Sequence, residues 1–366
     1  MEIVGIVFGI MGIVCFGISI CLFIQMKNER IRYLELKTKQ HKGGPNVVVI
    51  GGGTGQSIFL RGLKHHTQNI TAIVTVADDG GGSGVLRSDL GMLPPGDIRN
   101  CIMALANIEP TMNEVMQYRF EEGALKGQSF GNLFLAAMNG LYGNFETAVY
   151  KIGQVFAITG RVLPVTLENV DLSATLENGQ VVKGESTIPK EVRKQKCKID
   201  KITLIPEECR PLDEVISSIH GADIIVMGPG SLYTSVIPNL LVPGVIEAIK
   251  KSNAKKVYIP NVMTQPGETD GYNVLDHVEA LIKHTEPGLI DCIVTNNEKI
   301  SESVSRRYND DGSTQVLLDN EQRLKLKCMG IETVESNLIE VKDNYIRHNA
   351  DEISSIIVKL ALGYDM

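Results

Sequence analysis

Residues 51–55 read Gly-Gly-Gly-Thr-Gly and are the first stretch of the chain whose residue types suit ligand chemistry. Glycines permit tight turns with positive φ and leave backbone N–H groups bare. An apolar segment, 46–50, precedes this loop, and a helix-like segment, 56–64, follows it. Bare N–H groups and the positive end of a helix dipole both attract phosphate, so the pattern predicts an anion site. The alternative is a plain tight turn.

The spacing of this loop limits which phosphate ligand it can hold. A dinucleotide-binding fingerprint requires a glycine where Gln56 stands. A P-loop requires a lysine after Gly55, and none is present. The sequence therefore predicts a phosphate-bearing ligand that is bound neither by an NAD domain of the usual kind nor by a P-loop.

Two adjacent carboxylates, Asp78 and Asp79, end a second predicted strand at 70–77. Acidic residues at this place in nucleotide-binding folds contact ribose hydroxyls or a metal. Here they could do either, the metal being Mg²⁺ that keeps several of its waters. The alternative is a solvated acidic turn.

Two more polar loops follow predicted strands and carry hydroxyl, amide and glycine groups. One contains Gly228, Gly230 and Ser231, and the other contains Asn261 and Thr264. In open α/β sheets, ligands bind outside the carboxyl ends of the parallel strands. We therefore expect four loops to meet at one crevice, namely 51–55, 78–84, 228–235 and 261–271.

Two arginines near helix starts could bind an anionic group. Arg99 lies in the first turn of a predicted helix whose N-cap is Asp97, where it could hold an anion or serve only in capping. Arg347 precedes the last predicted helix, 350–362, whose N-cap is Asn349. Its guanidinium suits a bidentate phosphate or carboxylate contact, and a structural salt bridge is the alternative.

The elements that must position these residues alternate between strand and helix. This alternation predicts an α/β fold with a Rossmann-like, doubly wound and mostly parallel sheet. From about 161 to 206 the apolar period changes toward alternation, and Asn178-Gly179 marks a hairpin turn, which predicts a β-rich hairpin insertion. The other predicted strands are 223–227, 256–259, 289–295 and 315–318, and the other predicted helices are 133–142, 151–158, 242–251 and 273–283.

Composition sets broad limits on function. The chain has 366 residues, a net charge of -7 and a pI near 5.6, so it lacks the basic surplus that nucleic-acid binding needs. Its seven cysteines form no C-x-x-C pair, which is typical of a reduced compartment and predicts neither a disulfide framework nor a zinc site. The histidines show no metal-ligand spacing, and there is no G-x-S-x-G motif.

The N-terminus predicts a membrane anchor at 3–25, ahead of the folded domain. Residues 3–24 carry no charge, and at 1.5 Å per residue they span roughly 33 Å. A basic juxtamembrane linker, 26–45, follows, so the positive-inside rule places domain 46–366 in the cytoplasm, tethered to the inner face of the membrane. Gly5 and Gly9 form a G-x-x-x-G that could pack two anchors into a homo-oligomer, although glycine is common in membrane helices anyway.

Several motifs taken together resemble one protein family. They are 51–55, 74–81, 94–100, 228–235, 261–272 and the Arg-His-Asn at 347–349. These motifs are similar to those of the bacterial gluconeogenesis factor proteins, which are relatives of 2-phospho-L-lactate transferase. The similarity extends from about residue 46 to the end, so the predicted domain is CofD-like. The predicted anchor departs from the family, whose members are often cytoplasmic.

The resemblance implies a ligand, a role and a set of site residues. It implies a bound UDP-sugar such as UDP-N-acetylglucosamine, and a role in cell shape and wall synthesis during gluconeogenic growth. It also implies cell-wall synthesis proteins at the membrane as partners. By position, Tyr308 and Arg347 resemble the nucleotide-sugar contacts, and the glycine loops match the common site. The expected binding residues are Gly52, Gly53, Thr54, Gly55, Asp78, Asp79, Gly228, Gly230, Ser231, Asn261, Thr264, Tyr308 and Arg347.

Two hypotheses for function remain open at this level. In the first, the domain is a regulatory module that binds a UDP-sugar and passes metabolic state to wall-building machinery. In the second, it is a magnesium-dependent transferase of the 2-phospho-L-lactate transferase type, in which Asp78 and Asp79 hold Mg²⁺ against a nucleotide diphosphate. The sequence does not decide whether a reaction is catalysed, and an NAD-dependent dehydrogenase is a distant third.

Overall fold

The computed structural model describes residues 43–342 and 345–364. The chain separates into two units, Met1–Gly44 and Pro45–Met366, and of the first unit only residues 43 and 44 are among the described residues. The predicted anchor at 3–25 and the predicted linker up to residue 42 lie outside the described residues. Within the described ranges no single helix is long and apolar enough to cross a bilayer. Leu232–Leu240 and Val245–Lys251 pass that test only as a pair, bent by 73°.

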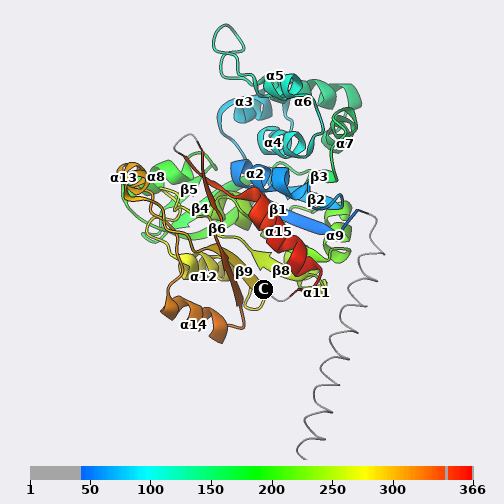
Figure 1. Cartoon of the computed structure of the whole chain (residues 1–366). Helices are drawn as coiled ribbons and strands as arrows, with labels where there is room; N and C mark the ends of the chain where they lie inside the picture. The colour runs from blue at the N-terminus through cyan, green and yellow to red at the C-terminus, as the bar shows by residue number, and fades with distance from the viewer. Residues whose placement is uncertain (1–42, 343–344, 365–366) are drawn as a thin grey trace, which may run out of the picture. The chain divides into compact units, whose positions relative to one another are not determined.

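Seven parallel strands form the main sheet in the order β10-β9-β8-β7-β1-β2-β3 (Figure 1). Every residue of strands β1, β2, β7 and β9 is buried, which suits strands covered on both faces. The strand order reverses between β1 and β7, and this reversal confirms the predicted doubly wound arrangement. The strands are β1 (Val47–Gly51), β2 (Ile70–Val74), β3 (Arg161–Pro164), β7 (Ile224–Met227), β8 (Lys255–Tyr258), β9 (Cys292–Asn296) and β10 (Glu332–Ser336).

The register of the three central strands brings their carboxyl ends level with one another. Ile50 of β1 lies opposite Ile73 of β2 on one side and Met227 of β7 on the other. From β1 the following strands are added in one direction across the sheet, and from β7 they are added in the other direction. With right-handed crossovers, this arrangement places the helices of the two halves on opposite faces of the sheet. The loops that follow β1 and β7 therefore leave the sheet side by side.

Two helices pack together over the first half of the sheet. Figure 1 shows α2 (Gly53–Leu63) beside α15 (Ala350–Ala361). A Cβ on Gly62 would lie 2.6 Å from the Ala350 carbonyl oxygen, so the helices touch at their backbones. The side chain of Asn349 accepts from the Glu352 N–H, which confirms the predicted cap of α15.

Five helices between β2 and β3 form a lobe, drawn at the top of Figure 1. Ser129 caps α6 by accepting from the Asn132 N–H, and Asn144 caps α7 by accepting from the Thr147 N–H. Because of these caps, α6 starts three residues before the predicted helix and α7 six residues before its own. The helices are α3 (Gly81–Leu90), α4 (Gly96–Leu105), α5 (Pro110–Gln117), α6 (Phe130–Tyr142) and α7 (Phe145–Val155).

The β-rich insertion is a separate antiparallel sheet of three strands, β4 (Asp171–Leu176), β5 (Val181–Lys183) and β6 (Ile199–Ile205), with α8 (Ile188–Gln195) inserted. Gly179 has φ +82, and the Leu176 N–H donates to the Gln180 carbonyl, so the predicted hairpin turn is confirmed. The predicted start of the insertion at 161 is wrong, because β3 pairs in parallel with β2 and belongs to the main sheet.

The remaining elements follow the alternating pattern with two corrections. The strand expected at 315–318 is reduced to one bridge between Gln315 and Met263. The loop expected at 228–235 is helical from Leu232, and a second helix precedes α11. These elements are α9 (Asp213–His220), the helical turn η1 (Leu232–Val236), α10 (Ile237–Leu240), α11 (Val245–Lys251), α12 (Val274–His284), α13 (Glu302–Asp310), α14 (Asn320–Cys328), β11 (Ile339–Lys342) and β12 (Tyr345–His348).

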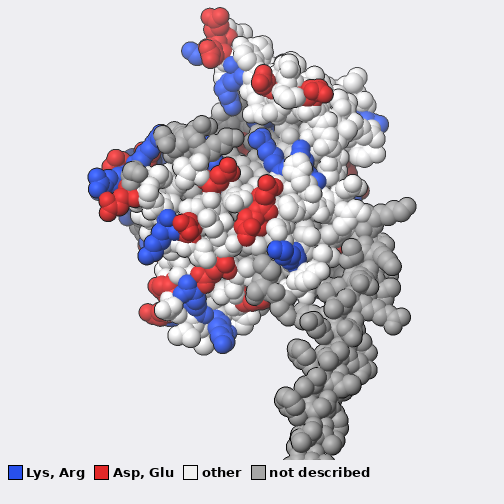
Figure 2. All heavy atoms as spheres, viewed as in Figure 1, with Lys and Arg blue, Asp and Glu red and all other residues white. Residues whose placement is uncertain are grey.

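Charged side chains of both signs are mixed over the face drawn in Figure 2. Several charged side chains of the described residues form ion pairs, such as Arg323 with Glu335 and Lys255 with Glu332. Exposed pairs of this kind contribute little to stability. The free energy of folding therefore comes mainly from the apolar core around the central strands.

Candidate functional site

The glycine loops after β1 and β7 touch each other at the strand-order reversal. A Cβ on Gly55 would lie 2.8 Å from the Pro229 carbonyl oxygen and 3.1 Å from the Gly230 nitrogen. A Cβ on Gly230 would lie 3.2 Å from the Gly52 carbonyl oxygen. Only glycine permits these approaches, so the two loops form one surface of backbone atoms with few side chains on it.

A buried amide fixes the relative position of these two loops. Asn239 of α10 donates from Nδ2 to the Gly51 carbonyl oxygen at 2.8 Å and to the Ser235 carbonyl oxygen at 2.7 Å. Its side chain is fully buried. Hydrogen bonds of a buried amide are strongly directional, so Asn239 holds the end of β1 against the start of the next helical segment.

The loop after β8 joins the same surface through side chains. Gln265 donates from Nε2 to the Ser231 hydroxyl at 2.6 Å, and Asn261 donates from Nδ2 to Gln265 Oε1 at 3.1 Å. Thr264 is buried and bonds to the backbone and hydroxyl of Thr314. Asn261, Gln265 and Ser231 thus present a connected row of polar groups across two loops.

The opposite wall comes from the C-terminal part of the chain. Tyr308 of α13 accepts a hydrogen bond from the Ile346 N–H at 2.8 Å, which joins α13 to β12. Arg347, the next residue on β12, has an exposed side chain. His348 follows and is buried, with 8% of its surface exposed. Tyr308 bonds the residue that precedes Arg347, so the two predicted contacts lie close together. The hydrogen-bonded residues Tyr308 and Ile346 are 38 positions apart in the sequence.

These three loops and this wall enclose a pocket of about 390 Å³, within the usual range for small-molecule sites. Ten of the thirteen expected binding residues line it, and the exceptions are Gly228, Asp78 and Asp79. The ten are Gly52, Gly53, Thr54, Gly55, Gly230, Ser231, Asn261, Thr264, Tyr308 and Arg347. We call this space the central pocket.

Asp97 lies between the central pocket and Asp78. A Cβ on Gly52 would lie 2.8 Å from Asp97 Oδ2, and the Gly53 N–H donates to the Asp97 carboxylate. Burial, and then the negative charge of Asp78, raise the pKa of Asp97 to about 7. Asp97 was expected to cap its own helix, and this is wrong, since the N-cap is Pro95 and the carboxylate caps α2 instead.

Three of the four loops that were expected to meet line the central pocket, and the loop at 78–84 does not. Asp78 accepts from the Gly80 N–H, and Asp79 accepts from the Ser186 N–H of the insertion. The physical reason is that both carboxylates accept from backbone N–H groups, of Gly80 and Ser186, that do not line the central pocket. Gly228 is likewise excluded, because its backbone lies against Ile259 at the end of β8.

The residues near Asp78 and Asp79 do not fit a preformed magnesium site. Among the residues that the structure describes, no three His, Cys, Asp or Glu side chains come together so that they could hold a metal ion. Asp78 and Asp79 each accept a hydrogen bond from a different backbone N–H, that of Gly80 and that of Ser186. No chemical step through a metal ion is therefore assigned.

Four carboxyl groups nevertheless lie within electrostatic range of Glu185, namely Asp78, Asp79, Asp97 and Glu268. Burial, and then the charges of the other carboxylates, raise the pKa of Glu185 to about 8. Burial raises the pKa of Glu268 to about 7. Groups with such pKa values can exchange protons near neutral pH.

Arg99 bonds protein groups at the base of the helical lobe. It donates to the Ser129 hydroxyl at 3.0 Å and to Asn100 Oδ1 at 2.7 Å. Burial lowers its pKa from the ordinary value. Of the two roles that the sequence left open, this arrangement favours the structural one, since Arg99 holds the cap of α6 against α4.

Sequence reasoning missed several residues of the central pocket. Gln265, Ser235 and Ser313 line it with polar side chains, and Ile58 and His348 complete it. Burial lowers the pKa of His348 to about 4, so its ring is neutral at physiological pH. His348 Nδ1 has no hydrogen-bond partner among the residues described. The signal that could have identified His348 is its place in the Arg-His-Asn motif beside Arg347, whereas metal-ligand spacing does not single it out.

A larger hollow of about 650 Å³ lies between α7 and the edge strand β3. Its charged lining consists of Glu146, Glu214 and Arg161, and Arg161 bonds Thr71 and Ser218. The two carboxylates repel a diphosphate, and the one guanidinium already bonds protein groups. The smaller central pocket is therefore the better candidate for an anionic ligand.

The fold and the site together define a doubly wound α/β protein with a ligand pocket at the topological switch point. The family described as 2-phospho-L-lactate transferase CofD matches residues 47–339. The chain is 48% identical over 317 residues to the gluconeogenesis factor of Bacillus subtilis strain 168, covering 86% of this chain and 98% of that protein. It is 47% identical over 315 residues to the gluconeogenesis factor of Halalkalibacterium halodurans, covering 86% and 96%.

A solved structure agrees with these relatives. The crystal structure of a UPF0052 family protein from Bacillus halodurans has a TM-score of 0.82 and 47% identity, and the match covers 86% of this chain and 99% of that one. The chain belongs to the CofD family and, within it, to the gluconeogenesis factors.

Proposed function

We propose that the central pocket binds a UDP-sugar, with UDP-N-acetylglucosamine as the first ligand to test. The observation that carries the proposal is the meeting of two glycine-rich loops, which carry few side chains, with Arg347 and Tyr308 around one pocket. Backbone N–H groups and the start of α2 suit a diphosphate, and a guanidinium forms charge-assisted bonds to phosphate. The row of Asn261, Gln265 and Ser231 offers donors and acceptors for the hydroxyls of a sugar.

The protein then acts as a regulatory binding module. Its relatives are named gluconeogenesis factors, and we propose that this chain likewise supports cell shape and wall synthesis under gluconeogenic growth. The ligand would report the supply of wall precursors. The uncharged stretch 3–24 would tether the domain to the inner face of the cytoplasmic membrane, where the local concentration of wall-building partners is raised.

Calorimetry with the purified full-length chain tests the ligand. We expect UDP-N-acetylglucosamine to bind with 1:1 stoichiometry, more tightly than UDP or GDP, and we expect NAD not to bind. Equal affinity for all nucleotides, or no binding at all, would overturn the proposal. Growth of a deletion strain on gluconeogenic and glycolytic carbon sources tests the physiological role, and identical cell shape on both would contradict it.

A second candidate is a transferase of the 2-phospho-L-lactate transferase type. The observation that favours it is the group of carboxyl groups with raised pKa beside Gly52, since acid–base catalysts have such pKa values. The match to the transferase family description adds to it. Incubation of the chain with the nucleotide sugar and Mg²⁺, followed by chromatography, separates the two functions. Release of nucleotide supports the transferase, and intact ligand after prolonged incubation supports the binding module.

A further inference from the structure

A second pocket, of about 360 Å³, lies between the insertion and the loop after β8. Arg193, Lys196 and Lys198 line it from the end of α8 and the start of β6, and Glu268 and Asp270 line it from the loop. It shares no lining residue with the central pocket. We call it the insertion pocket.

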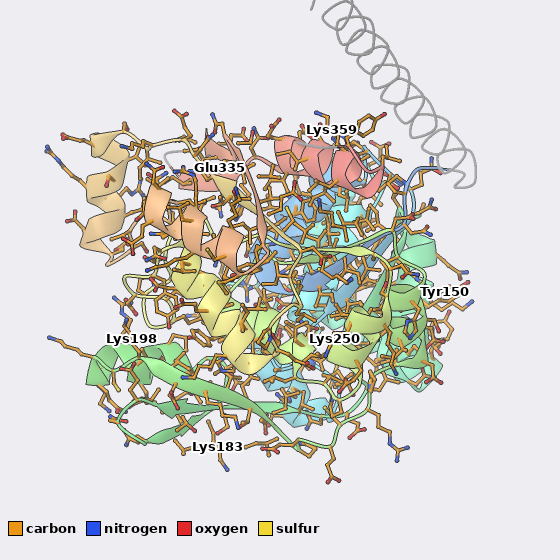
Figure 3. All side chains as sticks on the ribbon, turned by 90° about the horizontal axis from the view of Figure 1, so that it is seen from below. Tyr150, Lys183, Lys198, Lys250, Glu335 and Lys359 are labelled. Carbon is orange, nitrogen blue, oxygen red and sulfur yellow. The ribbon has the colours of Figure 1, made fainter. Side chains whose placement is uncertain are left out.

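The rim of the insertion pocket is cationic. Arg193 and Lys196 are exposed, and within the described part of the chain neither has an ion-pair partner. The ammonium of Lys198 lies 5.4 Å from the centre of the Tyr272 ring, and Figure 3 shows Lys198 on the insertion. Three like charges at one rim repel one another, and a bound anion removes that repulsion.

Glu268, a buried residue of the pocket lining, has one carboxylate oxygen without a donor among the described residues. Glu268 is 5% exposed, and its Oε1 accepts from the Thr234 hydroxyl at 3.3 Å. The backbone N–H groups of Tyr233 and Thr234 also donate to this carboxylate. Its Oε2 has no partner in the described ranges. A buried acceptor without a donor is costly, so an O–H or N–H of a ligand would be bound there.

We infer that the insertion pocket binds a monophosphate ester of a polyhydroxy metabolite. The phosphate would bind Arg193, Lys196 and Lys198, and a hydroxyl would donate to Glu268 and Asp270. Free phosphate would bind only the cationic residues of the rim, and an uncharged sugar would bind only the carboxylates Glu268 and Asp270. The volume lies at the lower end of the range for small-molecule pockets, which suits a metabolite of this size.

Glu268 also connects the insertion pocket to the central pocket. Its carboxylate holds the first turn of η1, and η1 continues the loop whose Ser231 and Ser235 line the central pocket. A hydroxyl bound at Glu268 would change the position of that turn. This coupling rests on the proposed binding of a UDP-sugar, and thermodynamic linkage makes it reciprocal.

Calorimetry with glucose 6-phosphate and the purified full-length chain, without nucleotide sugar, tests the insertion pocket. We expect glucose 6-phosphate to bind at least tenfold more tightly than inorganic phosphate, and glucose not to bind. Lys198→Gln should weaken binding at least tenfold. The control is Lys183→Gln, an exposed lysine on β5 that does not line the pocket, and it should leave the affinity unchanged.

Three outcomes of these titrations would overturn the inference. They are no binding of glucose 6-phosphate at millimolar concentration, equal affinity for glucose 6-phosphate and phosphate, and equal weakening by Lys198→Gln and Lys183→Gln. Tighter binding of a glutamate-rich peptide that displaces glucose 6-phosphate would also overturn it, in favour of a protein partner.

Repeating the titration with UDP-N-acetylglucosamine present tests the coupling. A change of at least fivefold in the Kd of glucose 6-phosphate supports it, and an unchanged Kd overturns the coupling while leaving the pocket assigned. If UDP-N-acetylglucosamine does not bind at all, the proposed function fails, and the first titration still decides the insertion pocket by itself.

Discussion

Gln56 donates a hydrogen bond from Nε2 to the Ile73 carbonyl oxygen at 3.1 Å, and so joins α2 to strand β2. The same nitrogen donates to the Val49 carbonyl oxygen of β1, and Oε1 accepts from the Cys101 thiol. Gln56 is fully buried and stands where a dinucleotide-binding domain has its third glycine. The residue that excludes an NAD fingerprint is therefore one that joins two central strands.

Replacing Gln56 with leucine should destabilise the protein by about 1–3 kcal/mol, because buried acceptors lose their donor. The measurement is the free energy of unfolding in urea. Gln68→Leu, at an exposed position, is the control and should change stability by less than about 0.5 kcal/mol. Equal effects of the two substitutions would show that the Gln56 hydrogen bonds contribute nothing.

Gly52→Ala should disrupt the loop after β1. The added Cβ would lie 2.7 Å from Thr75 Cγ2 and 2.8 Å from Asp97 Oδ2, so the loop or these two side chains must move, at a cost of about 1–3 kcal/mol. Gly140→Ala is the matched control, since nothing lies within 4 Å of its Cβ, and alanine should stabilise α6 by about 0.5–1 kcal/mol. Thermal unfolding measures both, and a neutral Gly52→Ala would contradict the tight packing of this turn.

Arg347→Ala should weaken binding of UDP-N-acetylglucosamine by about 10–150-fold. A hydrogen bond to a charged group contributes about 1.5–3 kcal/mol, and the exposed side chain can be removed without opening the core. Calorimetric titration gives the Kd. Lys359→Ala, on the exposed face of α15, controls for loss of a positive charge. An unchanged Kd for Arg347→Ala would place the ligand elsewhere.

The carboxyl group of Glu185 should make stability fall as pH rises. Its pKa in the folded protein is raised from 4.5 to about 8, so between these values the folded state binds the proton more tightly than the unfolded state. This contribution to stability is complete below pH 4.5 and is lost as pH rises through about 8. Glu185→Gln removes the titration, and it should therefore flatten the decline in urea midpoint between pH 5 and pH 9.

Glu177→Gln serves as the control for that experiment. Glu177 is exposed in the hairpin turn between β4 and β5, so its substitution should leave the pH dependence of the wild-type chain intact. A decline that is equally steep in Glu185→Gln and in the wild-type chain would mean that Glu185 is not the titrating group.

His284 should attach the insertion to the main domain only while its ring is neutral. Its Nε2 accepts from the Ile202 N–H at 2.9 Å, so the bonding pattern assigns the ring proton to Nδ1, which lies 2.8 Å from the Ala280 carbonyl oxygen. Burial lowers the pKa of His284 below its ordinary 6.5. This contribution is therefore complete above pH 6.5 and is lost as pH falls through the lowered pKa.

Hydrogen exchange of the Ile202 amide measures this attachment. After correction for the intrinsic rate, exchange should be slow at pH 7.5 in the wild-type chain and should become faster as pH falls through the lowered pKa. In His284→Leu it should be fast already at pH 7.5, and in His220→Leu, an exposed position, it should follow the wild type. Equal exchange rates in His284→Leu and in the wild-type chain at pH 7.5 would contradict the role of His284.

The sequence by itself determined the elements and the composition of the loops. Buried β-branched runs predicted the central strands, Asn178-Gly179 predicted the hairpin turn, and Asn349 predicted the cap of α15. These features depend on residues within a few positions of one another, and such interactions can be recognised from spacing. Eight of the ten expected residues that line the central pocket come from the polar loops, and Tyr308 and Arg347 came from the family resemblance.

The tertiary structure alone decided which of these loops share a pocket. That Asp97 takes the Gly53 N–H and lies between Asp78 and the central pocket depends on how α4 packs against α2 and β2. That β3 joins the main sheet depends on its register with β2. Strand order and helix packing arise from contacts between residues far apart in the chain, and no local pattern in one sequence records them.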